Sequence, residues 1–198
     1  MNLQAVTLQG QHARLEPLRS DHVAALSEAV QDGELWRLWY TAIPTPAAMA
    51  SELQRRLDLQ ASGSMLPFAV IHLPDERMAG MTTYMHIDSA NRRLEIGSTW
   101  YRKSLQRTAL NTECKRMLLG HAFEQLDCIA VEFRTHWHNT DSRRGIERLG
   151  AKLDGVLRSH QIAANGSLRD TCVYSIVASE WPAVRAHLDH ALSAHRTP

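Results

Sequence analysis

Residues 101–111 concentrate positive charge and hydroxyl groups immediately before a predicted helix. The cations are Arg102, Lys103 and Arg107, and the hydroxyl side chains are Ser104, Thr108 and, just beyond the segment, Thr112. Asn111 is the predicted N-cap of the helix. A loop that leaves a strand and opens a helix presents unpaired backbone N–H groups, and the helix dipole adds to their attraction for phosphate. The pattern predicts a diphosphate cradle, and the alternative is an ordinary solvated connection.

Several other catalytic patterns are absent from the sequence. There is no Gly-x4-Gly-Lys-Ser/Thr nucleotide loop and no Gly-x-Ser-x-Gly nucleophile elbow, which argues against two common enzyme classes. His136 and His138 lack a third ligand at helical or hairpin spacing, so no metal site is predicted. Cys114 falls on the apolar stripe of its predicted helix, which argues against a covalent acyl-cysteine.

The composition is that of a compact soluble domain. The chain has 198 residues, and 22 Lys and Arg against 21 Asp and Glu give a net charge of +1. One domain over residues 1–198 is expected. The balanced charge argues against a nucleic-acid partner, and no apolar run is long enough to span a membrane. Without a signal peptide and without closely spaced cysteines, the expected location is the reducing cytoplasm.

Hydrophobic periodicity predicts an alternation of helices and strands that positions the cradle. A strand is expected at 13–17 and helices at 20–30 and 46–61, followed by an antiparallel meander of strands at 68–71, 78–87 and 93–101. A helix from residue 111, a strand at 128–135, a helix at 139–149, a hairpin of strands at 156–162 and 171–177 and a helix at 180–194 follow. The strand–loop–helix–strand crossover after residue 93 implies a local parallel pair in a mixed sheet.

Four short runs together resemble the GNAT acetyltransferases, and more narrowly their RimJ/RimL-like branch. They are Glu95-Ile-Gly97, the run from Gln106 to Lys115, Asn139-x-x-Ser142 and Leu149-Gly-Ala151. The resemblance in element order spans nearly the whole chain. It implies an α/β (α+β) fold whose mixed, mostly antiparallel central sheet is flanked by helices and contains a splayed strand pair. It also implies acetyl-CoA as co-substrate, an amine acceptor and, as a family-level expectation, a homodimer.

The resemblance assigns the cofactor-binding role to three segments. The family's pyrophosphate loop and helix start correspond to Gln106, Arg107, Thr108, Ala109, Leu110, Asn111 and Thr112. Ala109 stands where the family usually has Gly, and Asn111 stands where it usually has Gly or Ala. Alanine at position 109 narrows the allowed backbone angles of the loop. The splayed strand corresponds to Thr99, Trp100 and Tyr101, and Asn139 with Ser142 corresponds to the contact with the cofactor arm. The alternative role for Trp100 is packing in the core, and the alternative role for Asn139 is that of a helix N-cap.

Amide formation from a thioester requires a base, an oxyanion donor and help for the leaving thiolate. Glu95 is the predicted base, because relatives carry a water-relaying carboxylate in this strand; the alternative is a salt bridge to Arg92 or Arg93. His86 and His72 are weaker candidates for the base. The tyrosine that many relatives place seven residues after the Asn is replaced by Ile146. Ser142 is therefore the predicted hydrogen-bond donor to the sulfur, unless it only caps or packs.

Two function classes remain open at this point. The first is an N-acetyltransferase that moves acetyl from acetyl-CoA to a primary amine, either a protein N-terminus or a small amine, by direct transfer in a ternary complex. The second is a CoA-binding sensor or interaction module without efficient turnover, suggested by Ile146 and the altered loop. Residues 36–45, with Trp36, Trp39 and Tyr40, and residues 158–170 are expected to roof the acceptor site. The alternative is that both tryptophans pack a helix onto the sheet.

Overall fold

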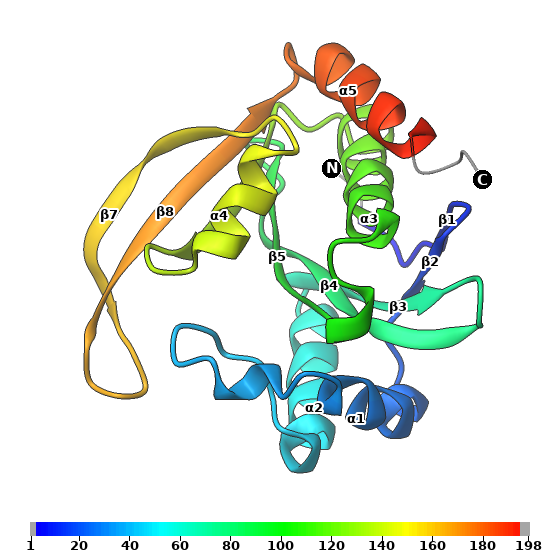
Figure 1. Cartoon of the computed structure of the whole chain (residues 1–198). Helices are drawn as coiled ribbons and strands as arrows, with labels where there is room; N and C mark the ends of the chain where they lie inside the picture. Colours follow the sequence, from blue (N-terminus) through cyan, green and yellow to red (C-terminus); the bar gives the residue numbers. More distant parts are fainter. Residues whose placement is uncertain (1–2, 195–198) are drawn as a thin grey trace.

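The computed structural model describes residues 3–194. Their strands form one eight-stranded sheet (Figure 1). In spatial order the strands are β1 (Leu8–Gln9), β2 (Ala13–Pro17), β3 (Met65–His72), β4 (Arg77–Asp88), β5 (Arg93–Tyr101), β6 (Ala130–His136), β8 (Leu168–Val177) and β7 (Lys152–Ile162). Every neighbouring pair is antiparallel except β5 and β6. The expected fold class, a mixed and mostly antiparallel sheet flanked by helices, is therefore confirmed.

Helices cover the sheet in two separate groups (Figure 1). On one face α3 (Ala109–Gly120), α4 (Thr140–Glu147) and α5 (Trp181–Ser193) bury the larger apolar core. On the other face α1 (Val23–Gln31) and α2 (Met49–Ala61) bury a smaller core that includes Met81 and Trp100. Because strand side chains alternate between faces, Leu94, Val131 and Cys172 join the larger core, and Glu95, Glu132 and Thr171 project from the opposite face.

The parallel pair of β5 and β6 is short, and the two strands then separate. Backbone pairing joins Arg93 to Ala130, Leu94 to Val131 and Glu95 to Glu132, and ends there. The six remaining residues of β5, residues 96–101, have β4 as their only strand neighbour in the described chain. An unpaired strand edge leaves backbone donors and acceptors for another partner. The predicted splayed strand pair is present.

A β-bulge bends β5 at the point where it leaves β6. The register with β4 shifts between the pairs Thr83–Gly97 and Met81–Trp100. Ser98, inside this interval, has a left-handed backbone with φ of 47°. A bulge increases local twist and redirects the strand, so it accounts for the divergence.

Several boundaries differ from the sequence prediction. The helix predicted from Asn111 begins at Ala109 with Thr108 as N-cap, and it continues through a π-helical turn at His121–Gln125. The strand predicted at 128–135 lies at Ala130–His136, and the final hairpin strands are longer than predicted. Short 3-10 turns lie at Ser20–His22, Leu35–Arg37, Pro46–Ala48 and Lys103–Leu105. Within residues 3–194 no helix is both long and apolar enough to cross a membrane.

Candidate functional site

A cleft of about 1200 Å³ lies where β5 and β6 separate. Most predicted site residues line it: Glu95, Thr99, Trp100, Tyr101, Gln106, Arg107, Thr108, Asn111, Asn139 and Ser142. They come from β5, the loop before α3, the first turn of α3 and the start of α4. The fold therefore brings these segments together, although Glu95 and Ser142 are 47 residues apart along the chain.

The N-terminus of α3 opens onto this cleft. The Thr108 hydroxyl accepts a hydrogen bond from the backbone N–H of Leu110 at 3.3 Å and donates to the Leu105 carbonyl at 2.8 Å. Arg107 has a left-handed backbone with φ of 63°, so the chain turns sharply just before the helix. The remaining unpaired N–H groups of the first turn lie at the positive end of the helix dipole. Asn111 is the third residue of the helix and not its cap.

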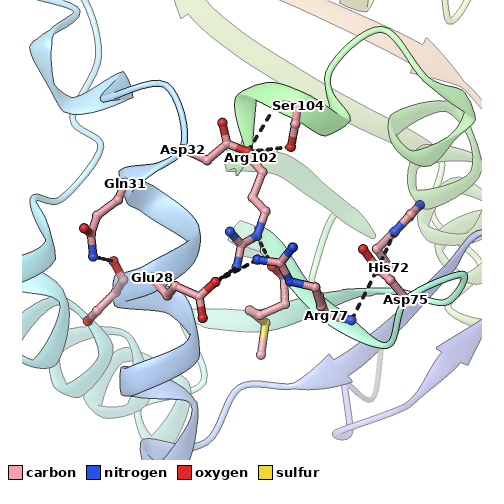
Figure 2. A network of polar contacts seen from close by, with 10 residues as sticks. Glu28, Gln31, Asp32, His72, Asp75, Arg77, Arg102 and Ser104 are labelled. Carbon is pink, nitrogen blue, oxygen red and sulfur yellow. Dashed lines mark hydrogen bonds and ion pairs between the residues drawn. The ribbon is translucent and has the colours of Figure 1, made fainter.

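Two residues predicted to contribute to the cradle are held elsewhere (Figure 2). The Arg102 guanidinium is buried; it donates to the Met78 carbonyl at 2.7 Å and to Glu28 at 3.0 Å. The Ser104 hydroxyl donates to the Asp32 carboxylate. Both residues therefore fasten the loop to α1, and the prediction that they face phosphate is wrong. Lys103 and Arg107 do line the cleft.

The remaining predicted loop residues turn their side chains inward. Ala109 and Leu110 are buried, and Leu110 packs in the larger core. The Thr112 hydroxyl is also buried and accepts a hydrogen bond from Arg148 at 3.0 Å. These three side chains are not among those lining the cleft. Any contribution of Ala109 to anion binding would come from its backbone N–H, because the Leu110 N–H already donates to the Thr108 hydroxyl.

Trp100 and Tyr101 pack on opposite faces of the sheet. Trp100 lies in the α1–α2 core and Tyr101 in the larger core, with side chains 4% and 6% exposed. Burial raises the pKa of the Tyr101 phenol well above its usual range. The Trp100 indole therefore packs in the core, which is the alternative given above for this residue. Trp100 and Tyr101 also border the cleft.

Asn139 and Ser142 lie at the start of α4, on the far side of the cleft. Asn139 Oδ1 accepts the backbone N–H of Ser142 at 3.1 Å, so Asn139 is the helix N-cap. Both residues also line the cleft. The cap fixes the orientation of the Asn139 side chain, and it does not prevent the amide from meeting a ligand.

Glu95 projects from the face opposite α3, at the closed end of the splay. Its side chain is 5% exposed; Oε2 lies 2.8 Å from His86 Nδ1 and 3.6 Å from Arg134 Nε. Burial raises the pKa of this carboxyl, although the hydrogen bond from His86 opposes the shift. The alternative pairing with Arg92 or Arg93 is wrong, because those residues pair with Asp127 and Glu132. A raised pKa suits a carboxylate that must accept and release a proton near neutral pH.

Gly97 leaves the space that Glu95 occupies. A Cβ atom at this position would lie 2.7 Å from Glu95 Oε1 and 2.7 Å from Met85 Sδ. The Glu95-Ile-Gly97 run is thus explained by geometry: a side chain on residue 97 would displace the carboxylate.

Aromatic side chains from residues 36–45 reach across to β6. The Trp39 ring lies edge-on to His136 with centroids 5.1 Å apart, and it is 5.7 Å from the ring of His138. Trp39 is 52% exposed, so packing of both tryptophans onto the sheet is wrong for Trp39. Trp36 does pack against the α1–α2 core. Tyr40, His160 and Arg169 also line the cleft, so both segments that are predicted to roof the acceptor site reach it.

Lys115 is a cleft residue whose burial has no signal in the sequence. It is 6% exposed, and its Nζ donates to Thr99 Oγ1 at 2.8 Å and to Thr82 Oγ1 at 3.2 Å. Burial lowers its pKa to about 8. Within residues 3–194 it forms no ion pair with a carboxylate. Lys115 therefore links α3 to the splayed strand, at the cost of a buried charge.

We expect Lys115→Met to stabilise the protein by about 2 kcal/mol at pH 7, because methionine removes a desolvated ammonium group. Thr82 and Thr99 keep their mutual hydrogen bond, at 2.8 Å. The unfolded chain binds more protons than the folded chain between pH 8 and 10.5, so the wild-type free energy of unfolding should rise with pH across that window. The variant should lack this rise. Urea unfolding at several pH values measures both effects, and a destabilised variant would contradict them.

Two further predictions are that Cys114 is not a covalent nucleophile and that the chain has no metal site. Cys114 is fully buried in the larger core, and burial raises the pKa of its thiol to about 12. In the described part of the chain no group of three or more His, Cys, Asp or Glu side chains has the arrangement of a metal site.

Comparisons with known proteins agree with this geometry. Residues 12–152 match the family model described as "Acetyltransferase (GNAT) domain". A GCN5-related N-acetyltransferase from Brucella melitensis has a similar structure, with TM-score 0.85, 30% identity and coverage of 96% of this chain and 86% of that one. RimJ of Mycobacterium smegmatis, solved in complex with CoA-disulfide, shares the fold, with TM-score 0.77, 24% identity and coverage of 94% and 93%.

One curated relative is a Bacillus subtilis (strain 168) protein named "Putative ribosomal N-acetyltransferase YdaF". It is 32% identical over 109 residues, which are 55% of this chain and 58% of that protein. The alignment thus spans less than two thirds of YdaF. Since the family model covers more than half of the chain and the splayed sheet carries the family's loop and helix, the chain belongs to the GNAT acetyltransferase family.

Proposed function

We propose that this protein is an N-acetyltransferase that moves the acetyl group of acetyl-CoA to a primary amine by direct transfer within a ternary complex. The observation that carries the proposal is the splay of β5 from β6, which opens the cleft between the N-terminus of α3 and the start of α4. The RimJ solved with CoA-disulfide has the same fold. Acetyl-CoA supplies an activated acetyl thioester.

The residues around the cleft fit the parts of the co-substrate. The first-turn N–H groups of α3, with Gln106, Arg107, Thr108 and Asn111, would hold the diphosphate. The free edge of β5 at Thr99, Trp100 and Tyr101 would pair with the amide groups of the pantetheine arm, and Asn139 would meet the arm from the opposite side. Ala109, Leu110 and Thr112 would act by placing these groups. Because the cations needed are local, they are compatible with a net charge of only +1.

The chemistry follows from the position of Glu95 on the face opposite α3. The neutral amine attacks the thioester carbonyl, a C–N bond forms, and the C–S bond of the tetrahedral intermediate breaks. Glu95 would collect the proton of the amine through water. Ser142 would donate a hydrogen bond to the departing sulfur, which ends as the thiol after protonation.

The second candidate is a CoA-binding sensor without efficient turnover. Ile146, at the position where many relatives carry a tyrosine, is buried in the larger core and provides no proton to the thiolate. The raised pKa and burial of Glu95 favour the enzyme instead, because a sensor has no use for a base at the transfer point.

The acceptor and the setting of the reaction are also proposals. YdaF is named a putative ribosomal N-acetyltransferase, which favours a protein N-terminus as the acceptor, and small amines are the other class. We propose a single domain over residues 1–198, a cytoplasmic location and a homodimer.

Isothermal titration of the protein with CoA tests the proposal. We expect one CoA site per chain, with affinity lowered at least tenfold by Asn139→Ala, which also weakens the helix cap. Arg158→Gln, on the exposed hairpin outside the cleft, is the matched control and should bind normally. A protein that binds no CoA is neither an acetyltransferase nor a CoA sensor.

A further inference from the structure

A polar surface lies on β6 and β8, on the face opposite α3 and α4. Its members are Arg134 and His136 of β6 and Arg169 and Thr171 of β8; His136 and Thr171 are register partners. All four line the cleft, as does Glu95. If the co-substrate lies against α3, the amine must approach Glu95 from this surface.

His136 has a hydrogen-bond donor with no acceptor. Its side chain is 4% exposed, and its Nδ1 accepts the backbone N–H of His138 at 3.0 Å. The proton of the neutral imidazole is therefore on Nε2. Nε2 is buried and has no hydrogen-bond partner among the described residues. A buried donor without a partner is rare in native proteins, which indicates that a ligand oxygen completes it.

Arg169 provides a positive charge beside this donor. It is half-buried, and its Nε donates to Thr171 Oγ1 at 3.1 Å. Within residues 3–194 it forms no ion pair. The guanidinium groups of arginines bind carboxylates by two parallel hydrogen bonds, and this one has free donors directed to no protein carboxylate.

The acidic groups near Arg169 are engaged with other partners. Glu95 accepts from His86, and Glu132 accepts from Arg93 and Arg134. Asp170 points to the other side of β8 and accepts from Arg158 and from the N–H of Ser159. Arg134 and His138 are the other basic groups near the surface. Glu95 attracts the Arg169 guanidinium electrostatically, but its carboxylate is hydrogen-bonded to His86, so Arg169 keeps free donors.

We propose that His136 and Arg169 bind a carboxylate of the acceptor, so that the substrate is a primary amine bearing a carboxylate close to the amine. The inference rests on the proposed function. Trp39, edge-on to His136 and half-exposed, would cover the same group. The surface disfavours polyamines, because the Arg169 guanidinium, which has no ion pair within residues 3–194, would repel their second ammonium.

Paired substrates test the proposal and distinguish its two sources, a free amino acid and a peptide N-terminus. Alanine is compared with alaninamide, and the peptide Ser-Asp-Ala-amide with Ser-Asn-Ala-amide, with kcat/KM normalised to the neutral amine fraction. In at least one of the two pairs, we expect the substrate with the carboxylate to have a kcat/KM roughly 10- to 100-fold above that of its amide counterpart. Arg169→Gln should abolish the preference through KM, and the exposed control Arg158→Gln should keep it. Equal rates within both pairs, or a preference that survives Arg169→Gln, would overturn the proposal.

Two substitutions separate recognition from structure at His136. Glutamine places an N–H donor near the position of Nε2, whereas asparagine keeps only an acceptor near Nδ1 for the His138 N–H. Recognition predicts that His136→Gln retains the acid preference and His136→Asn loses it; the reverse order would overturn it.

A binding experiment keeps the proposal testable if turnover fails. N-acetylalanine and N-acetylalaninamide are titrated into the CoA-saturated protein, with preferential binding of the acid as the expected result. Equal binding overturns the carboxylate site. Preferential binding of N-acetylalanine without any acetyl transfer would support the carboxylate site and contradict only the proposed function.

Discussion

Glu95→Gln is expected to lower kcat/KM for acetyl transfer by roughly 10²- to 10³-fold while leaving CoA affinity unchanged. General base catalysis is worth about this much, and the glutamine amide cannot accept the proton of the amine. Glu95 lies on the face opposite α3, away from the loop that is proposed to hold CoA. A substitution confined to the base should therefore affect the reaction and not the binding of the co-substrate.

The pH profile distinguishes a base from a structural carboxylate. Burial raises the pKa of Glu95, so wild-type kcat/KM should rise with pH through a value above the usual range of a glutamate. An acceptor amine of constant pKa supplies a second limb at higher pH, and that limb should persist in Glu95→Gln while the first disappears. Glu76→Gln, at an exposed carboxylate, is the control. A normal rate in Glu95→Gln would exclude Glu95 as the base.

Glu113→Gln is expected to destabilise the fold by about 4 kcal/mol. The buried Glu113 carboxylate of α3 accepts the backbone N–H groups of Gln11, His12 and Ala13 at 2.8, 2.7 and 2.8 Å. Charge-assisted hydrogen bonds contribute about 1.5–3 kcal/mol each, and an amide can neither carry the charge nor present two acceptor oxygens. Gly10 supports this arrangement, because a side chain there would collide with the carboxylate.

Thermal unfolding followed by circular dichroism measures this effect. For a chain of this size the loss corresponds to a fall in Tm of roughly 10 °C. Glu76→Gln, whose single ion pair with Arg14 is exposed, should change Tm little. At low temperature the Glu113→Gln protein should still bind CoA, since Glu113 lies outside the cleft. An unchanged Tm would contradict the anchoring role of Glu113.

Local patterns were sufficient to predict the part of the site built within one crossover. The strand ending at Tyr101, the loop and the helix are consecutive, so turn and capping chemistry predicts their order, but it does not predict which of their donors face the cleft. The predicted N-cap lies three residues too late, because Asn111 and Thr108 are both good caps and the contact of Thr108 with Leu105 decides between them. The fastening of Arg102 to Glu28 joins residues 74 apart, which no local pattern contains.

The acceptor side was harder to predict, because it is assembled from distant segments. Trp39 meets His136 across almost one hundred residues, and the proximity of His136 to Arg169 depends on the register of β6 with β8. Lys115 looks in sequence like one more charge on a helix. Only the packing of α3 against Thr82 and Thr99 shows that it is buried.

A screen of peptide and small primary amines with acetyl-CoA tests whether this protein catalyses acetyl transfer. Mass spectrometry detects the acetylated amine, and thiol release detects CoA. We expect one amine class to gain an acetyl group with an equal amount of CoA released, no acetylated protein to accumulate without acceptor, and Glu95→Gln to abolish most of the turnover. Binding of CoA without turnover on any amine would exclude acetyl transfer and favour the sensor.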